Sequence, residues 1–312
     1  MQEAVRTREP ELEQYRSELT AYCYRMLGSP FEAEDAVQES LVRAWRGLDR
    51  FEGRAQLRSW LYRIATNVCL DMLNAGQRRA RPMDLGPAQE PVIENLNTLP
   101  EVTWIEPMPD PAEAAVERET IRLAFVAALQ HLPPRQRAVL ILCEVLRWQA
   151  SEVAELLDTS VASVNSALQR ARATLATANV EDVKPSEVDR ELLERYVAAF
   201  ERYDIDSLTE LIREDARQSM PPYDMWLHGR DDIFTWWFGP GIGCKGSRVI
   251  PTVSANGSPA FGQYKPSESG EGFDPWALQV LEISDGRIAE LTFFLDTERI
   301  FPLFGLPLHL DA

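Results

Sequence analysis

Histidine, cysteine and lysine are scarce in this sequence of 312 residues, which has three histidines, four cysteines and three lysines among its 32 basic residues. The four cysteines (Cys23, Cys69, Cys143 and Cys244) lie far apart. No CxxC pair is present, and no His/Cys cluster has the spacing of a zinc site. We therefore expect free thiols that pack as small hydrophobic residues, with no bound metal and no other cofactor.

Long apolar runs are also missing. No stretch approaches the roughly 20 residues that span a bilayer, and the N-terminus has no apolar core typical of a signal peptide. These absences predict a cytoplasmic protein without membrane association. The length is sufficient for two or three domains, each with its own core.

Charge is distributed unevenly along the chain. The formal net charge is −17, but residues 40–81 have a balance of +6 and residues 120–179 one of +2. Residues 84–119 have a balance of −8, and residues 180–312 one of −12. Because affinity for phosphates comes from neutralising their charge, such a chain should bind bare DNA poorly and need a partner.

Periodicity and composition divide the chain into five segments. Residues 10–80 and 113–178 have helical patterns, whereas residues 81–112 hold seven prolines and indicate an extended acidic linker with Trp104 and Ile105 as contact points. Residues 179–187 form a short second linker. Residues 188–312 begin with two helical patterns, at 189–204 and 206–214, and continue with strand-like runs joined at Asp285-Gly286, a strong hairpin signal.

Residues 148–175 are typical of a helix–turn–helix. The first helix ends at Asp158-Thr159-Ser160; Asp tolerates the left-handed turn, and Ser160 can cap the second helix. Opposite the apolar stripe of the second helix lie polar residues of the types that read base edges and hold phosphates in the major groove. These are Ser163, Asn165, Ser166, Gln169, Arg170 and Arg172. The alternative is an ordinary pair of helices with a solvated face.

Residues 58–79 predict a helix with two faces. An apolar stripe includes Leu61, Ala65 and Val68, whereas Trp60, Arg63 and Asn67 fall together on another face. Arg78 and Arg79 follow. Aromatic rings interleaved with arginine suit unpaired nucleic acid, because bases stack on the rings and the cations follow the backbone. Packing of Trp60 against a neighbouring helix is the alternative.

The helical pattern at residues 32–48 also has a polar face. Asp35, Gln38 and Glu39 lie opposite its apolar stripe. Glu39 could form only a surface pair with Arg43, which is worth a few tenths of a kcal/mol. The same acidic face could instead dock on a partner. The residues alone do not favour either alternative.

At these residues the sequence resembles bacterial RNA polymerase sigma factors of the extracytoplasmic-function group. The stretch AEDAVQESLVRAW resembles the region 2 helix that docks on core polymerase. The stretch RSWLYRIATNVCLDML resembles the element that opens and reads the minus-ten sequence. The helix–turn–helix resembles region 4, which reads the minus-thirty-five element. The resemblance places Asp35, Gln38 and Glu39 at the core enzyme and Asn67 at a flipped-out base. It further implies that the linker passes near the active-site cleft of polymerase.

The last segment resembles the cone-shaped α+β fold of SnoaL-like domains, which are appended to one subset of these sigma factors. The resemblance to enzymes of this fold implies a pocket, for which Asp224, Trp226, His228 and Arg230 are the candidates, with Trp236, Trp237 and Phe238 able to line it. The GRDD stretch at Arg230 could equally cap a helix.

The predicted fold is therefore multidomain, with two all-α sigma domains and a C-terminal α+β SnoaL-like domain. The predicted function is promoter recognition with core polymerase and promoter DNA as partners, without catalysis. We also expect the C-terminal domain to contact the sigma domains and modulate them. The alternatives are a stand-alone helix–turn–helix regulator, which would bind duplex DNA without polymerase, and an isomerase or cyclase domain fused to a DNA-binding arm.

Overall fold

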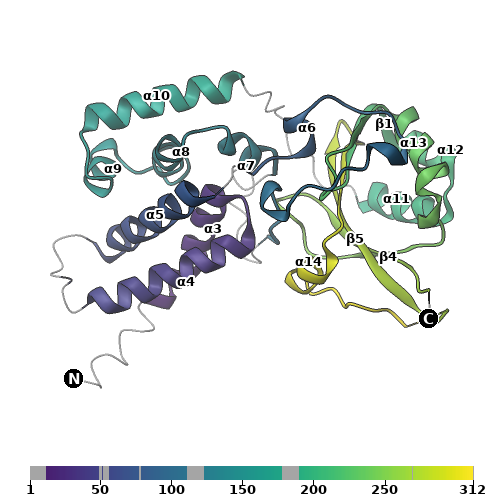
Figure 1. The fold of residues 1–312 in the computed structure, drawn as a ribbon, viewed down its shortest axis with the longest axis horizontal. Coiled ribbons are helices and arrows are strands. Elements are labelled where there is room, and N and C mark those ends of the chain that lie inside the picture. The colour runs from purple at the N-terminus through teal and green to yellow at the C-terminus, as the bar shows by residue number, and fades with distance from the viewer. Residues whose placement is uncertain are drawn as a thin grey trace. The chain divides into compact units, whose positions relative to one another are not determined.

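The computed structural model describes residues 12–48, 51, 56–76, 79–110, 123–177, 190–268 and 270–311. The chain divides into two compact units: the first unit comprises residues 1–79 and 123–180, and the second unit residues 80–122 and 181–312 (Figure 1). Arg78, a predicted DNA contact, lies outside the described residues. Within the described ranges, no helix is long and apolar enough to cross a membrane.

Three helices form the N-terminal half of the first unit: α3 (Arg16–Leu27), α4 (Pro30–Gly47) and α5 (Leu57–Ala75). Gly28 ends α3 in the left-handed conformation at φ 79°, which glycine adopts at no steric cost. The Ser29 Oγ then accepts a hydrogen bond from the Glu32 backbone N–H at 3.3 Å and caps α4. The turn between the two helices is thus determined locally.

The predicted apolar stripes of α4 and α5 form the core between these helices. Val37 and Ala44 of α4 are fully buried, as are Leu61 and Ala65 of α5. Cys23 and Cys69 meet in the same core, where a hydrogen bond between the two thiols, together with burial, raises the pKa of Cys69 well above its ordinary value. All four cysteines are free thiols, as expected.

The C-terminal half of the first unit contains the predicted helix–turn–helix. Helices α7 (Leu123–Gln130) and α8 (Pro134–Leu140) and a π-helical turn (Ile141–Val145) precede α9 (Ala150–Leu156) and α10 (Val161–Thr177). Asp158 adopts the left-handed conformation at φ 50°. The Ser160 Oγ accepts a hydrogen bond from the Ser163 N–H at 3.1 Å. Both features of the turn were predicted, and both are confirmed.

Replacing Ser160 with alanine should therefore destabilise the start of α10. Loss of an N-cap side chain costs about 1 kcal/mol, and thermal unfolding of the purified protein would measure it. Ser151→Ala, at an exposed position inside α9, is the control and should leave the melting temperature nearly unchanged. An equal shift in both variants would contradict the capping role.

The two halves of the first unit are joined through a buried arginine. Arg137 of α8 is 2% exposed. Its guanidinium donates to the Met26 carbonyl at the end of α3, to the Gln130 side chain at 2.5 Å, and to the carbonyl oxygens of Gln130 and Leu132 at 3.3 and 3.2 Å. One side chain thereby satisfies acceptors on three segments, which its fixed planar fork of donors allows.

An aromatic contact joins the same two halves. The Tyr62 ring of α5 lies 5.1 Å from the Trp148 ring, centroid to centroid. The Arg58 guanidinium lies 5.2 Å from the centroid of Tyr62 and 5.6 Å from that of Trp148, and it also pairs with Glu18 at 2.8 Å. These contacts place α5 against the segment that enters the helix–turn–helix.

The second unit is an α+β domain (Figure 1). It is built on one six-stranded sheet, with the strand order β2-β1-β6-β5-β4-β3. The strands are β1 (Ile212–Ser219), β2 (Trp226–His228), β3 (Arg248–Pro251), β4 (Ala260–Pro266), β5 (Phe273–Ser284) and β6 (Arg287–Phe294). The helices after residue 189 are α11 (Arg190–Arg202), α12 (Ile205–Leu211), α13 (Arg230–Phe238), a 3-10 turn (Pro240–Cys244) and α14 (Thr297–Leu303).

The predicted hairpin of β5 and β6 is confirmed, whereas the strands β1 to β4 were not predicted. Asp285 and Gly286 join β5 to β6 with φ of 52° and 72°, as a two-residue hairpin turn requires. Residues 212–214 were predicted to continue a helix, whereas they begin β1, which pairs in parallel with β6. Parallel pairing depends on a strand about 70 residues away, so the local pattern could not indicate it.

The predicted linker packs on the second unit. It contains α6 (Pro82–Leu85) and two 3-10 turns (Ile93–Asn95 and Glu101–Thr103). Trp104 is 3% exposed and Ile105 2% exposed, so both predicted contact points are buried. Proline-rich chain with few internal hydrogen bonds is ordered here by the domain that it crosses.

Candidate nucleic-acid interface

The polar face of α10 is available to a ligand. Val164 and Ala171 hold the helix to the core, and all six predicted DNA contacts on the other side are exposed: Ser163, Asn165, Ser166, Gln169, Arg170 and Arg172. The Arg170 guanidinium donates to the Ser166 Oγ at 2.8 Å, and Arg172 pairs with Glu144. Both arginines are exposed, and at exposed positions such pairs contribute little and can exchange for phosphates.

The second predicted face, on α5, is only partly open. Asn67 is exposed. Arg63 is exposed as well, but its Nη2 donates to the Glu155 carbonyl of α9 at 2.8 Å. Trp60 is half-buried, with its ring 4.9 Å from that of Phe51 and against the backbone at Gly47. The alternative of Trp60 packing on a neighbouring helix therefore describes part of its role.

Arg79 differs from its prediction as a DNA contact. It is 4% exposed and pairs with Glu32 of α4 at 2.9 Å. A guanidinium that is buried against a carboxylate cannot also reach a phosphate without breaking that pair. Arg79 therefore holds the end of the α5 segment to α4, and the DNA assignment is withdrawn.

The acidic face of α4 is exposed at Asp35, Gln38 and Glu39. Glu39 forms the expected pair with Arg43 at 2.7 Å. Beside it lies a hollow of about 270 Å³, lined by Leu12, Glu13, Arg16, Gln38, Leu41, Val42 and Trp45. Trp45 is 50% exposed, which is unusual for so large an apolar side chain. Sequence reasoning missed Trp45, although its place next to Val42 on the polar side was a usable signal.

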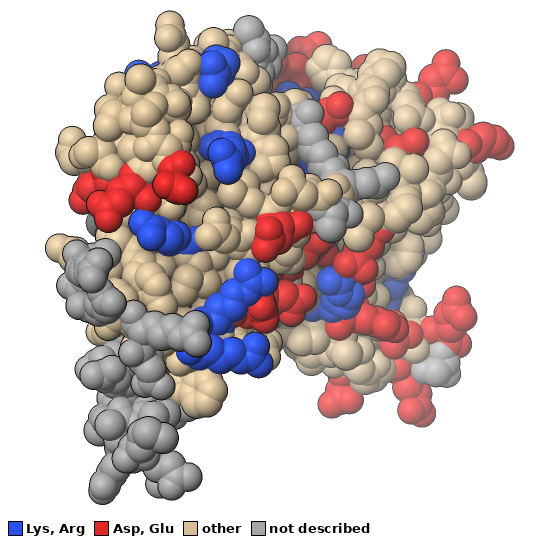
Figure 2. Space-filling model, turned by 60° about the vertical axis from the view of Figure 1, so that its left-hand side comes forward, with Lys and Arg blue, Asp and Glu red and all other residues tan. Residues whose placement is uncertain are grey.

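Charges on the surface are mixed. On the face drawn in Figure 2, lysine and arginine side chains occur in small groups, with acidic side chains close to several of them. Alternating signs give a weak field for a polyanion. The distribution agrees with the expectation that bare DNA is bound poorly.

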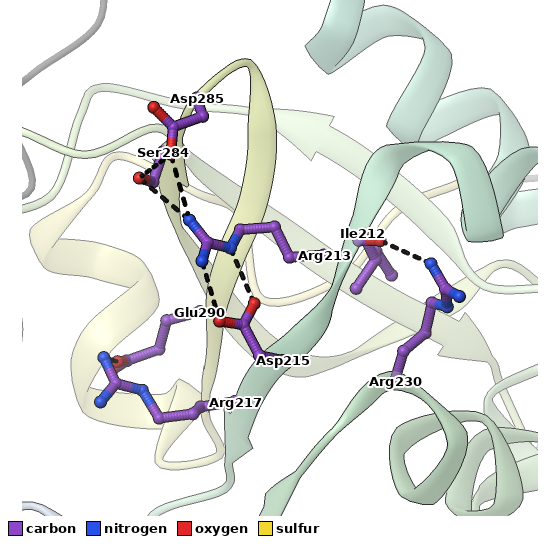
Figure 3. Close-up of polar contacts among 8 residues, drawn as sticks. All are labelled: Ile212, Arg213, Asp215, Arg217, Arg230, Ser284, Asp285 and Glu290. Atoms are coloured by element: carbon purple, nitrogen blue, oxygen red, sulfur yellow. Dashed lines mark hydrogen bonds and ion pairs between the residues drawn. The ribbon is translucent and has the colours of Figure 1, made fainter.

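Arg230 and Asp224, two of the predicted pocket residues, have other surroundings in the second unit. The Arg230 guanidinium donates to the Thr209 carbonyl at 2.9 Å and to the Ile212 carbonyl at 3.2 Å (Figure 3). Arg230 is the first residue of α13, whose N-cap is Gly229, so GRDD starts this helix without a side-chain cap. The backbone N–H of Asp224 donates to the Asn97 carbonyl at 3.0 Å. His228 is exposed.

Glu290 is a buried acid near these residues that the sequence did not single out. It lies on β6 and pairs with Arg217 of β1 at 3.1 Å (Figure 3). Burial raises the pKa of Glu290, against the opposing attraction of Arg81 and Arg217. The pair links the parallel strands β1 and β6 across the sheet, so we assign it a structural role.

A cavity of about 220 Å³ lies between the sheet, α11, α13 and the linker. Its walls are mainly aromatic and apolar, and they include the predicted Trp236 and Trp237. Asp224, Trp226, His228 and Arg230 are not among the residues that line it. No aspartate, glutamate or histidine of the described chain contributes to this lining, so the cavity has no carboxylate or imidazole to act as a general base.

The linker crosses the second unit through regular hydrogen bonds. The Trp226 Nε1 donates to the Gly86 carbonyl at 2.9 Å, and the Gln89 N–H donates to the Trp226 carbonyl at 3.0 Å. Further along, the N–H of Leu99 donates to the Pro222 carbonyl at 3.0 Å. Trp226 therefore holds the linker and does not line the cavity.

The end of the linker is held most firmly. Asn256, which is buried, accepts from the Met108 N–H at its Oδ1 and donates its own N–H to the Met108 carbonyl, both at 2.9 Å. The Asp110 Oδ1 accepts from the Gly257 N–H at 2.8 Å. Arg299 of α14 pairs with Glu101 and, at 3.3 Å, with the buried Glu106. Acidic linker residues thus meet specific partners on the domain.

Comparisons with known proteins agree with this division of the chain. Three family models match: sigma-70 region 2 at residues 12–79, sigma-70 region 4 at 122–175 and the SnoaL-like domain at 193–291. The ECF RNA polymerase sigma factor SigG of Mycobacterium tuberculosis is 46% identical over 315 residues, which cover 95% of this chain and 82% of the relative. SigJ of the same organism is 31% identical over 295 residues, which cover 90% and 89%.

The crystal structure of Mycobacterium tuberculosis SigJ has a similar fold, with a TM-score of 0.62 over 96% of this chain and 99% of that chain, at 22% identity. The order of elements, the polar face of α10, and the identity to SigG over nearly the whole chain agree with one another. The protein therefore belongs to the ECF RNA polymerase sigma factors, which are transcription initiation factors and not enzymes, and it joins sigma-70 regions 2 and 4 to a C-terminal SnoaL-like domain.

Proposed function

We propose that this sigma factor directs core RNA polymerase to specific promoters in the cytoplasm, and that its SnoaL-like domain restrains it by holding the linker. Region 4 would read the minus-thirty-five element with the polar face of α10. Region 2 would engage the minus-ten strand with Trp60, Arg63 and Asn67. Asp35, Gln38 and Glu39, extended by the exposed Trp45, would dock on the core enzyme.

Contacts inside the first unit support the idea that promoter binding needs a rearrangement. The bond from Arg63 to the Glu155 carbonyl, 2.8 Å long, occupies a cation that is proposed to follow a DNA strand. The Tyr62–Trp148 contact at 5.1 Å packs the same helix against region 4. Both contacts would have to open before α5 and α10 could reach promoter elements more than a helical turn of DNA apart.

The linker contact is the observation that supports modulation. Buried Trp104 and Ile105, the two bonds between Asn256 and Met108, and the ion pairs of Arg299 all hold residues 86–110 on the SnoaL-like domain. A linker held in this way cannot extend freely between regions 2 and 4. The resemblance implies that this acidic linker passes through polymerase. Release of the linker from the SnoaL-like domain would therefore favour the active complex of the sigma factor with core polymerase.

Arg299→Ala tests the restraint. Glu106 would lose this ion pair in a buried position, at a cost of about 2 kcal/mol after allowing for the partial exposure of Arg299. We expect several-fold more transcript in run-off transcription with purified core polymerase. Arg287→Ala, at the exposed first residue of β6, is the matched control and should behave like the parent protein.

Removal of residues 190–312 provides a second arm of the same test. If the domain acts by holding the linker, this truncation and Arg299→Ala should change transcript yield in the same direction. Unchanged yield in both would remove the regulatory role, and lower yield in both would reverse its sign. Neither result would alter the assignment to the sigma factors, which stands on the identity to SigG.

A further inference from the structure

The cavity of the SnoaL-like domain has the linker as one of its walls. Ile93 and Leu96 of the linker line it together with residues of α11, α13 and the sheet, among them Phe200, Trp236, Trp237 and Phe293. A cavity of about 150 Å³ with apolar walls accommodates a benzene ring. At about 220 Å³, this one has room for one or two fused rings.

Lys265 is the single charged residue in the lining of the cavity. Its ammonium lies 3.0 Å from the ring centroid of Trp276, another lining residue. In the part of the chain that the structure describes, no carboxylate lies within ion-pair distance of this ammonium. A cation at the wall of a mainly apolar cavity, without an ion pair among the described residues, favours an anionic ligand.

Gln218 adds a second donor. It is 1% exposed and lines the cavity, and its Oε1 accepts from the Trp237 Nε1 at 2.6 Å. That bond fixes the orientation of the amide and leaves its NH₂ group without a protein acceptor among the described residues. A donor in the lining of the cavity can be satisfied by an oxygen of a ligand.

We propose that this cavity binds a flat aromatic carboxylate of one or two rings, with its carboxylate toward Lys265 and its rings among the tryptophans. Ile93 and Leu96 touch the ligand only while the linker is docked, so the ligand strengthens docking by the same factor by which docking strengthens ligand binding. The coupling to transcription rests on the function proposed above, whereas the binding site itself does not.

A titration with 2-naphthoate tests the site. Quenching of tryptophan fluorescence and calorimetry of the full-length protein should give saturable binding, and the uncharged 2-naphthamide should bind about tenfold more weakly, since a hydrogen bond to a charged group is lost. Lys265→Met should remove this preference and Lys265→Arg should keep it. Lys245→Met, which changes an exposed lysine outside the lining, is the matched control.

Absence of saturable binding of 2-naphthoate, or equal affinity for the acid and the amide in the parent protein, would overturn the proposal. So would a preference for the acid that survives Lys265→Met or is lost in Lys245→Met. If circular dichroism shows that Lys265→Met does not fold, the proposal is tested by the affinities for 2-naphthoate and 2-naphthamide in the parent protein and in Lys265→Arg. Both proteins should prefer the acid.

The contribution of the linker to ligand binding is tested by truncating one of its side chains in the cavity wall. Leu96→Ala should weaken 2-naphthoate binding about 5–30-fold, because apolar contact is lost. Leu308→Ala, at an exposed apolar position outside the lining, should not. Unchanged affinity in Leu96→Ala would overturn the coupling. If 2-naphthoate binds but leaves run-off transcription unchanged, the site stands and its coupling to transcription fails, whereas Arg299→Ala and the truncation still decide the regulatory function.

Discussion

Arg137→Ala is expected to lower the free energy of unfolding of the first unit by about 3–5 kcal/mol. The substitution removes a buried cation together with its hydrogen bonds to Met26, Gln130 and Leu132. Each acceptor that stays buried without a donor costs about 1–3 kcal/mol, and the loss of side-chain volume leaves a cavity. Urea unfolding followed by circular dichroism would measure the change.

Arg135→Ala is the matched control, since Arg135 lies on the same helix but is exposed. Its effect should stay within about 0.5 kcal/mol, as for most surface substitutions. Equal losses in the two variants would contradict the proposed role of Arg137. Because Arg137 joins α8 to the end of α3, its loss should also increase proteolysis between regions 2 and 4.

Asn67→Ala is expected to slow promoter opening about 10- to 100-fold while leaving affinity for core polymerase unchanged. Asn67 is exposed on α5, away from the buried stripe, so its removal should not disturb folding. An amide that holds a base by two hydrogen bonds contributes about 1–3 kcal/mol. Permanganate reactivity of unpaired thymines in the promoter, together with a binding assay for core enzyme, would separate the two steps.

Asn74→Ala, an exposed asparagine near the end of the same helix, is the control for loss of a surface amide. Similar slowing by both variants, or loss of core affinity in Asn67→Ala, would disprove the assignment. Trp60→Ala is a less specific test of DNA binding than Asn67→Ala. Because its ring packs against Phe51 at 4.9 Å, that variant should lose folding stability as well as any contact with DNA.

Local patterns predicted the parts of this protein whose causes are local. The left-handed Asp158, the Ser160 cap and the Asp285-Gly286 hairpin follow from the conformational preferences of single residues. The apolar stripes of α4 and α5 follow from helical periodicity. The motifs in these helices also carried the resemblance to the sigma factor family, to which comparison over the whole chain then showed that the protein belongs.

Predictions that depended on distant partners fared less well. Arg79 and Arg63 have the same charge in the sequence, yet Arg79 is buried against Glu32 and Arg63 is exposed beside Glu155. The polar residues near His228 do not line the cavity, whose walls are aromatic and apolar residues from separate strands, helices and the linker, together with a few polar ones. Burial of an ionisable group is set by what folds over it, which no local pattern contains.

The sequence by itself determined which helices form, where their turns lie, which faces are polar and which family the motifs indicate, because these depend on spacing and on single-residue preferences. Only the tertiary structure decided that the proline-rich linker is part of the SnoaL-like unit, and that Ile93 and Leu96 help to enclose its cavity. Docking of that kind depends on surface shape and on partners such as Asn256 and Arg299, which lie more than 140 residues away in the chain. Contacts at such separations form when distant segments pack together, and local sequence patterns do not predict that packing.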